Sequence, residues 1–170
     1  MNQILGFASL IGFATALIVH IAALMGVNVS DNFPAIWWLH GGIFLVFIPF
    51  VFSSRKSLGP KPTFAELRAA FPKWVVGLGL CIAAYALVNF ALFMMNAAGG
   101  NPSIVDGKFV LLNRGNFIRE LSAVEYSTFK VNQVRGFSGH WLVFYFVPFA
   151  YFMFHKRSEP FNSTPSARLH

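Results

Sequence analysis

Charged side chains are scarce in this 170-residue chain, where they make up only 11% of the residues. Soluble domains carry roughly 25%. Hydrophobic residues account for 56% of the chain, and 21 of all residues are Phe. One core of this size cannot hide so much apolar surface from water. The composition therefore argues against an ordinary soluble domain and indicates that lipid surrounds much of the chain.

Cysteine is almost absent. The single Cys81 lies inside an apolar run and has no second cysteine for an internal disulfide. The chain also lacks the CxxC and Cys/His spacings of structural metal sites. We therefore interpret Cys81 as a small buried hydrophobe and predict no metal site.

Acidic residues are missing from every long apolar run. This absence removes the usual groups of intramembrane proton relays and carboxylate dyads. Ser138 and His140 lie two residues apart with no acidic residue to orient the histidine, so a catalytic triad is not expected. No Gly-rich phosphate-binding loop is present. The sequence predicts no enzymatic activity.

The net charge of +7 could suggest nucleic acid as a partner. However, the Lys and Arg residues occupy short segments between apolar runs, where membrane proteins carry them. They form no separate basic face, so nucleic-acid binding is not expected.

Four apolar runs are long enough to cross a bilayer as helices, which takes about 20 residues each. They predict an all-α membrane protein with spans at about 4–25, 35–53, 74–96 and 137–154, forming a single integral membrane domain of residues 1–170. In the first run Ala8, Gly12 and Ala16 recur every four residues, and His20 continues this stripe. Small residues at this spacing let another helix approach closely, so His20 is expected to face protein.

The segment 97–135 is the one substantial insertion between spans. Residues 108–112 and 117–121 flank Asn113-Arg114-Gly115-Asn116 and predict a β-hairpin. Ser122 and Glu125 then form a capping box, which predicts a helix to about Val134. A second capping box, Thr63 and Glu66, predicts a short surface helix over 63–71 in the loop between spans two and three.

The distribution of Lys and Arg predicts the orientation. The loop 54–73 and the C-terminal tail together hold eight, the first connection 26–33 holds none, and the insertion holds five, which three acidic residues offset. By the positive-inside rule both termini are expected in the cytoplasm and the insertion outside it.

Two pairs of segments indicate a duplication of helical hairpins. His40 to Phe50 resembles His140 to Phe149, and Ala16–His20 can be laid on Tyr85–Asn89. Parallel repeats of this kind occur in membrane proteins. The alternative is that apolar helices resemble one another by composition alone. A true repeat would pair His20 with Asn89 and His40 with His140.

His20, His40, Asn89 and His140 are the candidate site residues. At a rise of about 1.5 Å per residue, His20 and His40 lie about 8–9 Å inside the same membrane boundary. Asn89 has a similar depth and His140 is somewhat shallower. Polar groups at this depth need partners and are expected to face the bundle interior. The favoured interpretation is a structural layer of hydrogen bonds with no cofactor. The alternatives are axial ligation of haem b by two histidines and a quinone pocket beside the layer.

Phe117–Tyr126 and Val134–Trp141 resemble segments of a group of small bacterial four-helix membrane proteins. The resemblance covers about a third of the chain. It implies four spans and a bacterial source, and no activity or site residue is carried over from it.

The sequence thus predicts a non-catalytic accessory or assembly subunit of a larger complex in the bacterial inner membrane, plausibly respiratory or photosynthetic. The expected partners are the lipid bilayer and other membrane subunits, which would bind the 97–135 insertion. The alternative is a redox protein that binds haem b or quinone through the histidine layer.

Overall fold

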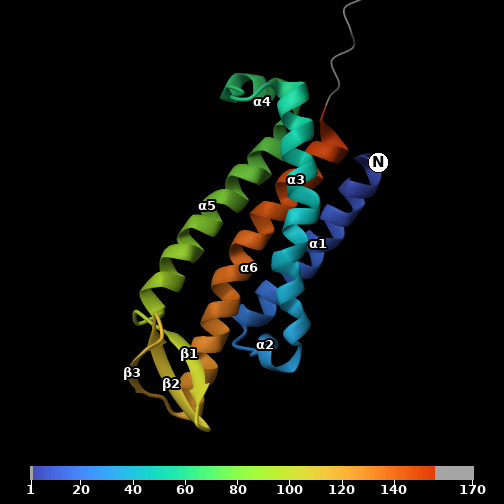
Figure 1. Cartoon of the computed structure of the whole chain (residues 1–170). Helices are drawn as coiled ribbons and strands as arrows, with labels where there is room; N and C mark the ends of the chain where they lie inside the picture. Colours follow the sequence, from blue (N-terminus) through green and yellow to red (C-terminus); the bar gives the residue numbers. More distant parts are fainter. Residues whose placement is uncertain (1, 156–170) are drawn as a thin grey trace, which may run out of the picture.

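The computed structural model describes residues 2–155, which form four long helices and a small sheet at one end of the bundle (Figure 1). The N-terminal part comprises α1 (Asn2–Leu24), α2 (Val29–Asn32), a 3-10 turn η1 (Pro34–Trp37) and α3 (Trp38–Leu58). It is followed by α4 (Phe64–Ala70), α5 (Lys73–Asn96), strands β1 (Asn101–Val105), β2 (Lys108–Asn113) and β3 (Asn116–Glu120), and α6 (Ala123–Phe154). We call the end with the strands the sheet end, and the other the α4 end.

Helix α6 is the centre of the bundle, and α1, α3 and α5 all pack against it. Its Trp141 and Val134 are completely buried, and Tyr145 lies in the same core with residues of α1 and α3. Close approach depends on small residues: a Cβ added at Gly12 of α1 would lie 2.2 Å from Cε1 of Tyr145. The predicted stripe is buried at Gly12, Ala16 and His20, but Ala8 is exposed and Ser9 takes its place.

All four long helices of the described chain are long and apolar enough to cross a membrane. Much of their apolar surface lies on the outside of the bundle, including Leu45, Leu87 and Met95. Cys81 belongs to this outer surface as well, so its interpretation as a buried residue was wrong. The apolar run around it has no single polar face, and the sequence therefore did not show which side turns outward.

Helix α6 is continuous over 32 residues, whereas the sequence predicted one helix to about Val134 and a separate span from Phe137. Arg135-Gly136 lies between these two predicted helices. In the structure Gly136 lies against Phe93, whose ring carbon Cγ is 2.4 Å from the position a Cβ would take. This glycine therefore serves packing against α5 and does not end the helix. The bounds of the other long helices differ from the predicted ones mainly at α3, which runs five residues further, to Leu58.

The insertion forms a three-stranded antiparallel sheet of order β1-β2-β3. The predicted hairpin corresponds to β2 and β3, and β1 is an additional strand. Both connections are two-residue turns with positive φ, Asp106-Gly107 (49° and 75°) and Arg114-Gly115 (49° and 85°), the geometry that tight hairpins prefer. Asp106-Gly107 was a signal for the first hairpin that the sequence interpretation missed. Pro102 within β1 is compatible with a strand because β1 lies at the edge of the sheet.

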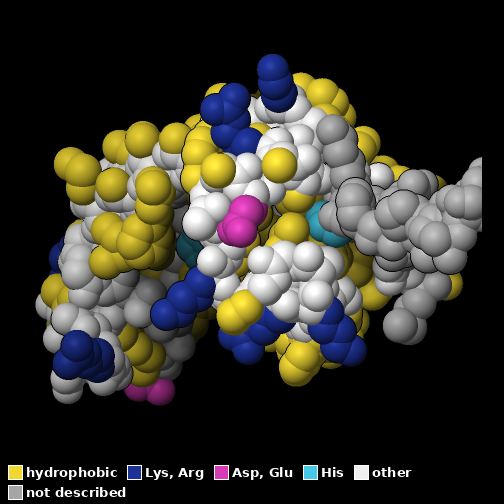
Figure 2. Space-filling view, turned by 90° about the horizontal axis from the view of Figure 1, so that it is seen from above, with side chains coloured by type: hydrophobic (Ala, Val, Ile, Leu, Met, Phe, Trp, Pro, Cys, Tyr) yellow, Lys and Arg dark blue, Asp and Glu magenta, His cyan; other side chains and the backbone are white. Residues whose placement is uncertain are grey.

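The α4 end carries the loop between α3 and α5. Helix α4 is the predicted short helix, and its capping box is formed: Glu66 accepts a hydrogen bond from the main-chain N–H of Thr63 at 2.6 Å. This bond lowers the pKa of the Glu66 carboxyl below its ordinary value. Lys and Arg side chains surround this end of the molecule (Figure 2). Most of the tail, for which the sequence predicted an extended strap, lies outside the described residues.

Candidate functional site

His20 is buried between α1, α5 and α6 and uses both ring nitrogens. Its Nδ1 lies 2.7 Å from Oγ of Ser138 on α6, and its Nε2 lies 2.5 Å from the hydroxyl oxygen of Tyr85 on α5. Only 2% of His20 is exposed. A single side chain of α1 thus bonds to both α5 and α6.

The neighbouring bonds determine which tautomer fits. Ser138 Oγ lies 2.6 Å from the main-chain carbonyl oxygen of Val134, to which it donates its one hydrogen. It must then accept a hydrogen bond from Nδ1–H of His20. This leaves Nε2 of a neutral His20 to accept a hydrogen bond from the hydroxyl of Tyr85. The lone pair that a metal ion would need is therefore occupied.

Asn89 is the second buried polar residue of the layer. Its Nδ2 donates a hydrogen bond of 3.0 Å to the main-chain carbonyl oxygen of Arg135. Gly139, one turn further along α6, makes room for the amide: a Cβ there would lie 2.2 Å from Nδ2 of Asn89. Since Ser138 also approaches the Arg135 carbonyl at 3.3 Å, the bonds of Asn89 and His20 meet on one turn of α6.

His40 and His140 occupy a different environment. His40 is exposed on α3, where its Nδ1 accepts a hydrogen bond of 3.1 Å from the indole N–H of Trp141. His140 is half-buried on α6 and contacts Phe90 and Phe137. Both histidine rings lie against the ring of Phe137, at centroid distances of 5.7 and 5.6 Å.

Of the four side chains expected to face the interior, His20 and Asn89 do so and His40 does not. Within residues 2–155 no hydrogen bond joins His20 to Asn89 or His40 to His140, the pairs that a duplication would form. His20 and Asn89 meet through α6 instead. The sequence interpretation missed Tyr85 as a partner of His20. Tyr85 lies one helical turn before Asn89, a spacing that puts both on one face of α5.

Arg135, three residues before Ser138, is the charged residue closest in sequence to the polar layer. Its Nη2 donates a hydrogen bond of 3.1 Å to Oδ1 of Asn132, and its buried Nε has no partner among the described residues. The side chain lines a cavity of about 470 Å³ between the ends of α1, α5 and α6. Asn96, Thr128 and Glu125 contribute polar groups to this cavity, and Ala23, Leu24 and Val131 contribute apolar ones.

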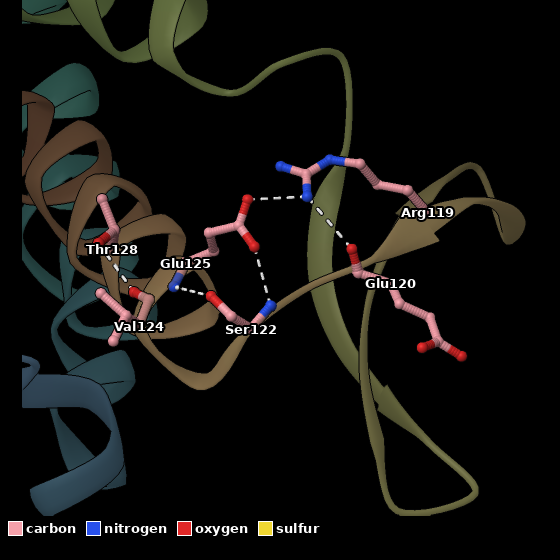
Figure 3. A network of polar contacts seen from close by, with 6 residues as sticks. All are labelled: Arg119, Glu120, Ser122, Val124, Glu125 and Thr128. Carbon is pink, nitrogen blue, oxygen red and sulfur yellow. Dashed lines mark hydrogen bonds and ion pairs between the residues drawn. The ribbon is translucent and has the colours of Figure 1, made fainter.

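The junction between β3 and α6 fixes the sheet relative to the bundle (Figure 3). Glu125 accepts a hydrogen bond of 2.8 Å from the main-chain N–H of Ser122, completing the predicted capping box, and its other oxygen lies 2.8 Å from Nη1 of Arg119. On β1, Asn101 accepts a hydrogen bond from Gln133 of α6. The sheet is therefore attached to α6 at both of its outer strands.

No group of three or more His, Cys, Asp or Glu side chains within residues 2–155 is arranged to hold a metal ion. The polar layer connects helices: Ser138 lies beside the imidazole of His20, but its hydroxyl hydrogen bonds to the main-chain carbonyl oxygen of Val134 and not to the ring. Comparison of the chain with protein-family models, with curated proteins and with solved structures finds no match.

Proposed function

We propose that this chain is a four-span protein of the bacterial inner membrane with both termini in the cytoplasm. Four apolar helices whose outer surfaces are hydrophobic support the membrane location. The α4 end carries Arg55, Lys56, Lys61, Arg68 and Lys73. This excess of positive charge supports a cytoplasmic position for that end, which puts the sheet on the opposite side of the membrane.

We further propose that the protein is a non-catalytic accessory or assembly subunit of a larger membrane complex, and that β3 is its docking element. The observation that supports this proposal most strongly is the free edge of β3. Every residue of β3 is exposed, whereas β1 packs beside α6 (Figure 1). β3 pairs only with β2, so its outer main-chain groups have no strand partner within the described chain.

The partner that fits this edge is an extended segment of another subunit, added as a fourth strand. Main-chain hydrogen bonds would hold such a segment, and side-chain contacts would select it. Phe117 and Ile118 are 62% and 42% exposed and offer apolar contacts beside the edge. An exposed strand with apolar side chains is otherwise a site of aggregation, which a dedicated partner would prevent.

The buried polar layer supports a structural role for the bundle. His20, Ser138, Tyr85 and Asn89 use one another and the main chain of α6 as partners. Such hydrogen bonds determine how helices pack in a membrane. They hold α6 in register and thereby fix the position of the sheet that α6 carries.

Copurification from mild detergent tests the accessory role. Tagged full-length protein is expected to bring down a membrane protein in constant stoichiometry, and a variant with Phe117→Lys is expected to lose it. Ile104→Lys is the matched control, because Ile104 is a similarly exposed apolar residue on β1. A monomer without any stoichiometric partner would contradict the proposal.

A second candidate function is the binding of a lipid-soluble quinone beside His140. No hydrogen bond to this side chain is found within residues 2–155, and it is the one polar side chain lining an apolar cavity of about 410 Å³. The cavity lies between α5 and α6, with Phe90 and Phe144 in its wall. A quinone ring could stack there and accept a hydrogen bond from the imidazole. Quinone extracted from purified protein should then fall on His140→Leu and remain on His40→Leu.

A further inference from the structure

The cavity beside Arg135 has the features of a binding site for an anion with an apolar tail. A guanidinium has five N–H donors. In Arg135 one of them bonds to Asn132, and no carboxylate forms an ion pair with this arginine among the described residues. The buried Nε has no hydrogen-bond partner within residues 2–155. A half-buried positive charge with unused donors is costly unless an anion satisfies it.

The position of the arginine is held by the protein. Asn132 is 8% exposed, and its Nδ2 donates to the main-chain carbonyl oxygen of Phe93 at 3.2 Å. This bond aims Oδ1 of Asn132 at the guanidinium. The donors of Arg135 are thus positioned before a ligand arrives, which reduces the entropy lost on binding.

The cavity is amphipathic. Asn96 and Thr128 add an amide and a hydroxyl to the lining, and each donates to a main-chain carbonyl of its own helix, at 2.7 and 2.9 Å. Ala23, Leu24 and Val131 provide an apolar wall. Glu125 also lines the cavity and would repel an anion. However, this carboxylate is paired with Arg119 at 2.8 Å and capped by Ser122, so its charge is already compensated.

The cavity lies where α1 and α5 end, at Leu24 and Asn96. In the membrane placement proposed above, this level is the boundary between acyl chains and headgroups. We propose that the cavity binds the phosphate group of a phospholipid, with the phosphodiester oxygens on Arg135 and an acyl chain along Leu24 and Val131. Arginine suits this ligand because its planar donors bind phosphate in a bidentate manner.

Native mass spectrometry of the purified full-length protein, delipidated and then incubated with defined lipids, tests this proposal. Phosphatidylglycerol is expected to form a one-to-one adduct, whereas diacylglycerol, which lacks phosphate, is not. Arg135→Gln is expected to weaken the adduct about tenfold or more, as for the loss of a charged hydrogen bond. Arg114→Gln removes the same charge at an exposed turn and should leave binding unchanged.

A second variant keeps the arginine and fills the cavity. Thr128→Phe changes an exposed residue of the cavity wall, so it should reduce lipid binding while the melting temperature without lipid stays the same. If this variant and Arg135→Gln both bind phosphatidylglycerol like the original chain, the proposal is wrong. If glycerol phosphate displaces the lipid at equal concentration, the acyl chain contributes nothing to binding. The site would then bind a soluble phosphate compound, and the assignment to lipid fails. The inference rests on the proposed membrane placement and not on docking through β3. A variant that loses lipid binding and still copurifies its partner would show that the two roles are independent.

Discussion

The Nε2 atom of His20 lies 2.5 Å from the hydroxyl oxygen of Tyr85, and this contact joins α1 to α5 inside the bundle. Replacing Tyr85 with Phe removes the hydroxyl and leaves a buried lone pair without a partner. We expect Tyr85→Phe to lower the free energy of unfolding by about 1–2 kcal/mol, in the range of hydrogen bonds between membrane helices. Thermal unfolding in detergent would measure the change.

Tyr126→Phe is the matched control for this prediction. The Tyr126 ring stacks on Phe109 at 4.6 Å, but no hydrogen bond of its hydroxyl is found within residues 2–155. Its replacement should therefore change stability by less than about 0.5 kcal/mol. Equal effects of the two variants would show that the His20–Tyr85 bond contributes nothing particular.

Gly139 is predicted to be essential for the contact of α5 with α6. Gly139→Ala places a Cβ where Nδ2 of Asn89 now lies, and should destabilise the protein by about 1–3 kcal/mol through overpacking. Gly41→Ala is the control, because nothing lies within 4 Å of an added Cβ there. The control should be neutral or stabilising by up to about 1 kcal/mol, since Ala favours helix more than Gly does. If both variants melt alike, the packing of Asn89 against Gly139 is not tight.

The sequence sufficed for the four long helices because hydrophobicity over about 20 residues depends on local composition. The two capping boxes were also predictable, since Thr63 with Glu66 and Ser122 with Glu125 are local patterns. The continuity of α6 was not, because a glycine looks the same whether it ends a helix or accommodates a ring such as that of Phe93. The duplication remains a prediction.

The candidate site could be predicted only in part. The depth of His20 and Asn89 followed from helix length, and both are buried. Their partners depend on how each helix is rotated, which the apolar runs do not reveal because their surfaces are hydrophobic almost all around. For the same reason the exposed position of His40 and the cavity beside Arg135 required the structure.

The absorption spectrum tests the haem alternative. We expect purified protein, expressed with ample haem, to show no Soret band. The lone pair of His20 Nε2 accepts from Tyr85. Nδ1 of His40 accepts from Trp141, which puts the proton of the neutral ring on its Nε2, so neither histidine has a free lone pair for iron. A Soret band that disappears on His20→Ala or His40→Ala would replace the accessory-subunit proposal with a b-type haem protein.

Cysteine labelling tests the orientation. In a Cys81→Ala background, a cysteine at Asn116 in the β2–β3 turn should react with a membrane-impermeant maleimide in intact spheroplasts. A cysteine at Lys61, exposed at the α4 end, should react only after lysis. The opposite pattern would reverse the assignment of the termini.

The docking role of β3 is tested most directly by photo-crosslinking in living cells. A photo-reactive amino acid at position 117 on β3 should crosslink to one discrete membrane protein partner, and the same amino acid at position 104 on β1 should not. This result is expected because every residue of the edge strand β3 is exposed, whereas the other edge strand, β1, lies beside α6. Crosslinks from position 117 to lipid alone, or to no defined protein, would contradict the proposal that this chain is an accessory subunit docking through its sheet.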